Sequence, residues 1–214
     1  MAEQHLPTPV DLSGPTLLLG VPGDVHLLDL RGVETDLAGR WVAESPAGVP
    51  VGVRVLDPTA VAAAMEVGAT LVHVDVALAG AAEVLEAARS GAVVVVGGEL
   101  EVAQRAARTL LDGGARPEHV VVELEASPAT VATLPAGVRA AEAAGLGVGA
   151  VVAPGGGPAA EVLGWELGVL TRLLALRVRT VRGVPLHRFR RVRAVVEAVA
   201  AAAPLGAPGA GVGR

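Results

Sequence analysis

Residues 176–202 read LRVRTVRGVPLHRFRRVRAVVEAVAAA, and this stretch decides the fold. From Val178 to Arg182 it alternates between apolar and polar side chains, which is typical of a β-strand. Gly183 then interrupts the pattern, and an arginine-rich helix is predicted from about Pro185. We interpret the stretch as the last strand and last helix of a (β/α) barrel, and the preceding chain as the units that lead up to it.

The preceding chain repeats the same alternation of strand and helix. Seven further strands are predicted, at Thr16–Val21, His26–Leu30, Val51–Leu56, Leu71–Val76, Ala92–Val96, Val120–Leu124 and Val148–Val152. Helices are predicted at Thr35–Glu44, from Asp57 to Gly68, up to Arg89, at Glu99–Leu111, from Ser127 to Ala144, and up to Ala175. Such alternation indicates a parallel sheet with helical crossovers, and eight strands favour an α/β TIM-type (β/α)8 barrel. An open doubly wound sheet is the alternative, but no G-x-G-x-x-G follows the first strand.

One irregularity concerns the first two predicted strands. Only residues 22–25 join them, whereas a parallel crossover needs roughly a dozen residues. Either the two strands form a hairpin, or one of them is not a barrel strand, or the barrel is distorted there. We therefore expect a barrel that is distorted or incomplete at its first β/α unit. Residues 1–203 are expected to form one domain, and the Gly/Pro/Ala-rich residues 204–214 a disordered tail.

Composition excludes several classes of function. The chain of 214 residues contains no Cys, Lys, Asn, Ile or Tyr, so it has neither a disulfide nor a thiolate site. The net charge of −5 gives no basic surface for nucleic acid. No apolar run reaches the roughly 18 residues of a membrane span, and no signal peptide is evident. We expect a cytoplasmic protein that binds no membrane, and we predict no metal site and no cofactor, since no His/Asp/Glu cluster has metal-ligand spacing.

Strand alternation predicts which side chains face the barrel interior. Valines at alternate positions are expected to face the helices, which turns the residues between them inward. The catalytic and binding residues of barrel enzymes lie at the carboxyl ends of the strands. The candidate ligand-binding residues are Asp29, Arg54, His73, Asp75, Glu123 and Arg182.

Two interpretations of this polar set remain open. In the first, Asp75 or Glu123 accepts the N–H edge of a ring, Arg54 or Arg182 binds an anionic group, and His73 is the candidate base by residue type. In the second, the charges pair with one another, for example Arg54 with Glu123 or Arg182 with Asp29, and fill the barrel. Buried charges are tolerated only when they are paired and hydrogen-bonded.

Two further segments carry candidate binding residues. Gly155, Gly156 and Gly157 precede a predicted helix, whose free N–H groups and dipole would favour an anion; the alternative is a flexible loop. The last helix carries Arg188, Arg190, Arg191 and Arg193, which would form either a contact with an acidic partner or nucleic acid, or a solvated face. The acidic chain favours the solvated face.

The order of several motifs resembles the dihydropteroate synthase family. The matching segments are residues 11–15 (DLSGP), 29–35 (DLRGVET, like D-I-G-G-E-S-T), 50–61 (PVGVRVLDPTAV, like P-I-S-V-D-T), 68–76 (GATLVHVDV, like G-A-D-I-I-N-D-V), 112–124 and 177–184. Together they cover nearly the whole chain in the same order. The chain therefore resembles a shortened and divergent member of this family, which forms a pterin–aminobenzoate bond inside a (β/α)8 barrel.

The family's ligand residues are only partly present. The resemblance places Arg54 where the family has a pterin-binding Asp, and Glu123 where it has the Asp of the sixth strand. It places Thr180 and Arg182 where the family has its closing Arg and His. The family's metal-linked Asn and its Lys have no counterpart, because the chain contains neither residue type. Asp29, Glu34 and Thr35 keep the family's residue types.

Three functional hypotheses follow from these residues. The first is a dihydropteroate synthase-like protein that has lost synthase activity, a pseudoenzyme that retains pterin-like or phosphate binding or acts through a partner. The second is an active pterin-dependent transferase with a rebuilt site. The third is a structural or interaction barrel plugged by ion pairs. The resemblance also implies a homodimer, or a heterodimer with a homologue, through the late helices.

Overall fold

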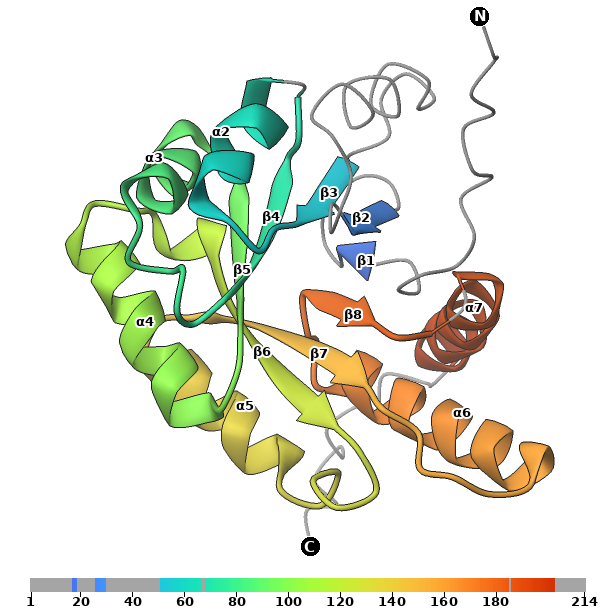
Figure 1. The fold of residues 1–214 in the computed structure, drawn as a ribbon. Coiled ribbons are helices and arrows are strands. Elements are labelled where there is room, and N and C mark those ends of the chain that lie inside the picture. Colours follow the sequence, from blue (N-terminus) through green and yellow to red (C-terminus); the bar gives the residue numbers. More distant parts are fainter. Residues whose placement is uncertain (1–16, 19–25, 30–50, 67, 185, 203–214) are drawn as a thin grey trace, which may run out of the picture.

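The computed structural model describes residues 17–18, 26–29, 51–66, 68–184 and 186–202, and it is a curved sheet with helices on its outside (Figure 1). The strands are β1 (Leu17–Leu18), β2 (His26–Asp29), β3 (Val51–Arg54), β4 (Leu71–Asp75), β5 (Val93–Gly97), β6 (Val120–Ala126), β7 (Gly147–Val152) and β8 (Thr180–Arg182). The helices are α2 (Pro58–Glu66), α3 (Ala82–Ser90), α4 (Leu100–Asp112), α5 (Leu134–Ala143), α6 (Ala159–Ala175) and α7 (Leu186–Ala202), with a short 3-10 turn, η1 (Pro117–His119). The helix predicted at Thr35–Glu44 and the tail at 204–214 lie outside the described residues.

The sheet is a parallel α/β barrel that is incomplete at its start. Its strand order is β1-β8-β7-β6-β5-β4-β3-β2, and every neighbouring pair from β2 to β8 is parallel. β1 pairs with β8 in the antiparallel direction, Leu17 opposite Val181. In the described residues β1 and β2 therefore stand at opposite edges of the sheet. This confirms a TIM-type barrel that is distorted at its first unit, as the short connection between these strands required.

Helix boundaries follow local chemistry. At the start of α2, the Asp57 Oδ1 atom accepts hydrogen bonds from the backbone N–H and the hydroxyl of Thr59, at 2.8 and 2.7 Å. These bonds hold the pKa of Asp57 below its ordinary value. α5 begins later than the sequence predicts, at Leu134 instead of near Ser127. The Thr130 hydroxyl donates to the Glu125 carbonyl at 2.6 Å and holds this segment in turns.

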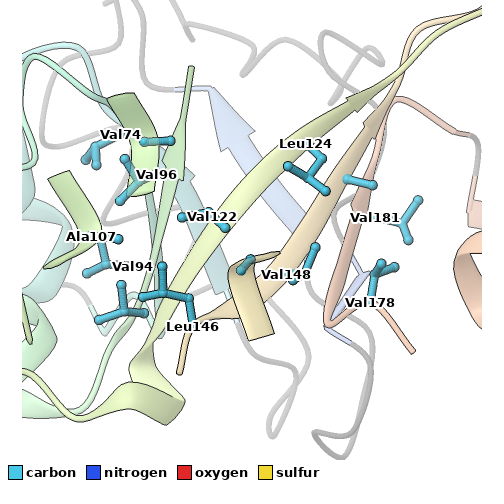
Figure 2. Close-up of a cluster of buried hydrophobic side chains, with 14 of the residues drawn as sticks. Val74, Val94, Val96, Ala107, Val122, Leu124, Leu146, Val148, Val178 and Val181 are labelled. Atoms are coloured by element: carbon cyan, nitrogen blue, oxygen red, sulfur yellow. The ribbon is translucent and has the colours of Figure 1, made fainter. Parts of the chain in front are cut away.

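Alternate side chains of the strands enter two separate apolar clusters. The larger one lies between the sheet and the helices and includes Val74, Val94, Val96, Val122, Leu124 and Val148 together with Ala107 of α4 (Figure 2). The smaller one consists of Leu71, Val95 and Val121, with Val93 packed against it. We call the set Leu71, Val95 and Val121 the floor cluster. Because it uses the opposite strand parity, the floor cluster lies on the inner face, which agrees with the faces predicted from valine alternation.

Candidate functional site: an ion-paired acid on the inner face

The inner face carries a buried acid, Glu123, above the floor cluster. Glu123 lies on β6 two residues after Val121, so both side chains share one face of the sheet. Its side chain is only 5% exposed. A carboxylate buried to this extent requires compensating charge and hydrogen bonds.

Arg182 supplies the compensating charge. Its Nε atom donates to Glu123 Oε1 at 3.1 Å, and its Nη2 atom donates to Oε2 at 2.6 Å. The two parallel bonds form a fork-on-fork pair, the strongest geometry that an arginine and a carboxylate can adopt. Arg182 is two strands away in the sheet order, so its side chain crosses in front of β7 to reach β6.

His73 approaches the same carboxylate from the other side. Its Nε2 atom lies 3.1 Å from Glu123 Oε2, and the imidazole is almost completely buried. Because an ionised carboxylate only accepts hydrogen bonds, the hydrogen must lie on His73 Nε2. Glu123 thus accepts hydrogen bonds from His73 on β4 and from Arg182 on β8.

Two glycines allow these side chains to meet. Register places Gly97 opposite Glu123 on one side and Gly149 opposite Glu123 on the other, with Thr180 next to Gly149. A Cβ atom at Gly97 would lie 3.0 Å from His73 Cε1, and a Cβ at Gly149 would collide with Thr180 Oγ1. The polar layer is therefore built from alternate strands β4, β6 and β8, while β5 and β7 contribute glycines, an arrangement typical of barrel interiors.

The surroundings of Glu123 lower its pKa to about 2 from an ordinary value of 4.5. Burial is the largest single influence and raises the pKa of this carboxyl, but the hydrogen bonds and charges of His73 and Arg182 together more than offset it. Glu123 is therefore ionised at neutral pH.

Acid should remove the stabilisation that Glu123 supplies. Because the folded-state pKa is depressed, this contribution is fully present above about pH 4.5 and is lost as the pH falls toward 2. The difference corresponds to about 3 kcal/mol. Urea denaturation measured from pH 6 to 2.5 should show the free energy of unfolding of the wild type falling by about 2.5 kcal/mol more than that of Glu123→Gln, since all other carboxyls are common to both proteins. If the stability of the two proteins depended on pH in the same way, the stabilising role of ionised Glu123 would be contradicted.

The other predicted site residues occupy different positions. Arg54 is half-buried on β3 in register with His73, and Asp29 is the last residue of β2 in register with Arg54. Asp75 ends β4 and is exposed. The side chain of Asp29 lies outside what the structure describes. Glu123 thus pairs with Arg182 and His73 instead of the predicted Arg54, because Gly149 leaves Arg182 a path across β7.

Three polar atoms of this inner face have no hydrogen-bond partner among the described residues. They are Arg54 Nε, His73 Nδ1 and Thr180 Oγ1, all of them buried. Sequence reasoning missed Gly97 and Gly149 as site residues, and it named Thr180 only as the position of the family's closing Arg. Glycines inside the valine-rich strands were the available signal, because glycine in a strand often marks a close approach of other groups.

The glycine segment before α6 remains a predicted anion site. Gly155, Gly156 and Gly157 are exposed and lead to Pro158, the residue before the helix. Glu161 lies in the first turn, where its carboxylate already complements the helix dipole.

The described segments also bear on metal binding and membrane insertion. They contain no group of three or more His, Cys, Asp or Glu residues placed to hold a metal ion. None of their helices combines the length and apolarity that crossing a membrane requires.

The solved structures most informative for this fold are dihydropteroate synthases. One, a dihydropteroate synthetase crystallised with a product, aligns over 83% of this chain and 82% of its own, with a TM-score of 0.67 and 12% identity. The enzyme from Stenotrophomonas maltophilia aligns over 82% of both chains, with a TM-score of 0.64 and 19% identity. The chain has the fold of the dihydropteroate synthases.

A third structure supports the same dihydropteroate synthase fold. The Burkholderia cenocepacia enzyme aligns over 83% of this chain and 82% of its own, with a TM-score of 0.60 and 19% identity. No family model matches the sequence, and no curated protein matches it either. At these identities the likeness concerns the fold, while the chemistry has to be argued from the residues of this chain.

Proposed function

We propose that this chain is a dihydropteroate synthase-like barrel that has lost synthase activity. The observation that carries the proposal is the closure of Glu123 by Arg182 and His73. Under the family resemblance, Glu123 stands at the acid of the sixth strand. A carboxylate that already accepts an arginine fork and an imidazole has about one of its four lone-pair sites left, so it cannot accept two hydrogen bonds from the N–H edge of a pterin ring without losing one of these partners.

Residue types support the same proposal. Arg54 stands where the resemblance places a pterin-binding Asp, so the charge at that position is reversed. The Asn and Lys that the family uses cannot be supplied by a chain that contains neither. The remaining acid, Asp75, is exposed at the end of β4, and it is the candidate acceptor if a pterin-like ring still binds.

A direct assay tests the loss of synthase activity. The purified protein is incubated with dihydropterin pyrophosphate and 4-aminobenzoate, and the Stenotrophomonas maltophilia enzyme is run beside it as the positive control. We expect no pteroate above a protein-free blank. Turnover that disappears in Glu123→Gln would overturn the proposal and favour an active transferase with a rebuilt site.

A second copy of this chain is the partner that the late helices fit. Val195 and Val199 of α7 are 63% and 64% exposed. Arg193 and Glu197 pair with each other along α7, with 2.7 Å between Arg193 Nε and Glu197 Oε1, on the side of the helix away from Val195. Val195 and Val199 are one turn apart and share a face, so a second α7 packed on that face about a two-fold axis would cover the same apolar pair of each copy.

Sedimentation velocity tests this association. The wild type is expected to sediment as a dimer, and Val195→Glu with Val199→Glu as a folded monomer, because four buried carboxylates would then face one another across the two-fold axis. Arg108→Met, an exposed change on α4, is the matched control. A monomeric wild type at micromolar concentration would end this part of the proposal.

A further inference from the structure

The Arg182 side chain passes over the acid in its own row of the sheet and reaches a deeper one. Register places Arg182 opposite Val151 of β7, and Val151 opposite Glu125 of β6, so Glu125 lies in the same row on the inner face. Glu125 is exposed, whereas the guanidinium pairs with Glu123, one row deeper and only 5% exposed. Arg182 is therefore directed into the inner face and not along its rim.

The guanidinium covers the carboxylate from the more accessible side. The Arg182 side chain is 15% exposed, three times the exposed fraction of Glu123. Gly149 lies between the two strands in the row of Glu123, and it contributes no side chain that would block the crossing. Arg182 has a further interaction within the molecule as well, so Glu123 is not its only partner. Truncating Arg182 would vacate a space that borders Glu123 and opens to solvent.

The two bonds from Arg182 have the geometry of a ligand contact. Nε and Nη2, both attached to the central guanidinium carbon, donate to the two oxygens of Glu123 at 3.1 and 2.6 Å. A free guanidinium or amidinium ion presents the same edge of two N–H donors on one carbon. Glu123 is ionised at neutral pH, and the contact with His73 Nε2 fixes its Oε2 atom. The carboxylate is thus preorganised for such an edge, which Arg182 supplies from within the chain.

We infer that Glu123 and His73 form a binding site for a planar guanidinium or amidinium group, and that Arg182 closes this site as a built-in ligand. The inference deepens the proposed function and rests on it, because the commitment of Glu123 to Arg182 is what removes this acid from use. The backbone tether gives the Arg182 side chain an effective concentration on the order of millimolar or above. A free ligand of millimolar affinity therefore does not displace Arg182 from the wild type, and the contact is autoinhibitory.

Methylguanidine, which reproduces the head of an arginine side chain, tests the inference in the full chain carrying Arg182→Ala. Calorimetry should show saturable binding to this variant and none to the wild type, with sodium chloride as the control for ionic strength. At twenty times its Kd, methylguanidine stabilises the folded variant about twentyfold, which raises the unfolding midpoint of a chain of this size by about 4–7 °C. Arg182→Val removes the same head with a residue that favours strands, so it replaces Arg182→Ala if the alanine variant does not fold.

Three further variants locate the bound ligand. Arg182→Met fills the vacated space with an uncharged side chain and should bind methylguanidine at least tenfold more weakly than Arg182→Ala does. Arg182→Ala combined with Glu123→Gln keeps the space but removes the charge of the acceptor, and a loss of at least tenfold is expected. Arg108→Ala, exposed on α4, removes an arginine without opening the site and should not bind.

Three results would overturn the inference. The first is that about 20 mM methylguanidine neither binds to nor promotes the folding of Arg182→Ala and Arg182→Val. The second is equal affinity with and without Glu123→Gln, which would place the ligand elsewhere. The third is binding to the wild type as tight as to Arg182→Ala, which would show that Arg182 does not close the site. Failure of the proposed function is separable, since it would appear as pteroate formation by the wild type, whereas these affinities are measured in variants without Arg182.

Discussion

Replacing Arg182 by Met should destabilise the protein by about 3 kcal/mol. The change removes both bonds of the fork and leaves Glu123 buried at 5% exposure with His73 as its remaining partner. Loss of the guanidinium also raises the pKa of Glu123 relative to the wild type, since one of the influences that lowers it is gone. Denaturation in urea at pH 7, followed by circular dichroism, measures the loss.

A double variant shows how much of the destabilisation comes from the broken ion pair and how much from the lost packing of the Arg182 side chain. Adding Glu123→Gln to Arg182→Met removes the stranded charge, so the double variant should be less destabilised than the sum of the two single variants. Arg108→Met should lie within about 0.5 kcal/mol of the wild type. If the stability losses of Arg182→Met and Glu123→Gln add up in the double variant, the ion pair is not the cause of the destabilisation.

Replacing Gly183 by Ala should cost about 3 kcal/mol or more, for two reasons that combine. Gly183 follows β8 with a φ of +85°, a left-handed conformation that costs a residue with a Cβ roughly 1–2 kcal/mol. The added Cβ would also collide with the carbonyl oxygen of Val152, a backbone atom that cannot rotate away.

Gly145→Ala is the matched control for Gly183→Ala. Gly145 has a φ of +75°, but its Cβ would meet nothing within 4 Å, so only the conformational cost of about 1 kcal/mol remains. Thermal unfolding of the two variants measures the difference. If both variants lost the same stability, the collision of the new Cβ with the Val152 carbonyl would contribute nothing measurable.

Much of the fold follows from local patterns in the sequence. In β4 and β6 the polar residues His73 and Glu123 indicate which alternate side chains face inward, because strand side chains alternate regardless of what surrounds them. β5 is valine from Val93 to Val96, so its two faces are not distinguishable from the sequence. The short connection after the first predicted strand indicated a defect in the barrel. Which strand would turn antiparallel was not predictable, since β1 is only Leu17–Leu18 and its partner is β8 at the far end of the chain.

The site was predicted as a set of residues but not as a set of contacts. His73, Glu123 and Arg182 were identified as inward polar residues, whereas the pairing of Glu123 with Arg182 was not. That pairing depends on the register of three strands and on Gly149, whose missing side chain opens the path. A single sequence contains the alternation within each strand, but it does not contain the offset between strands.

Among the described strands, β1 and β2 are not paired with each other, and this bears on what holds the curvature of the sheet. A closed barrel keeps its diameter because its backbone hydrogen bonds form an unbroken ring, and in the described residues this ring is interrupted. The contacts from His73 through Glu123 to Arg182 connect β4 to β8 across the inner face of the sheet. We therefore expect a change in the charge of these ion-paired side chains to loosen the curvature of the sheet.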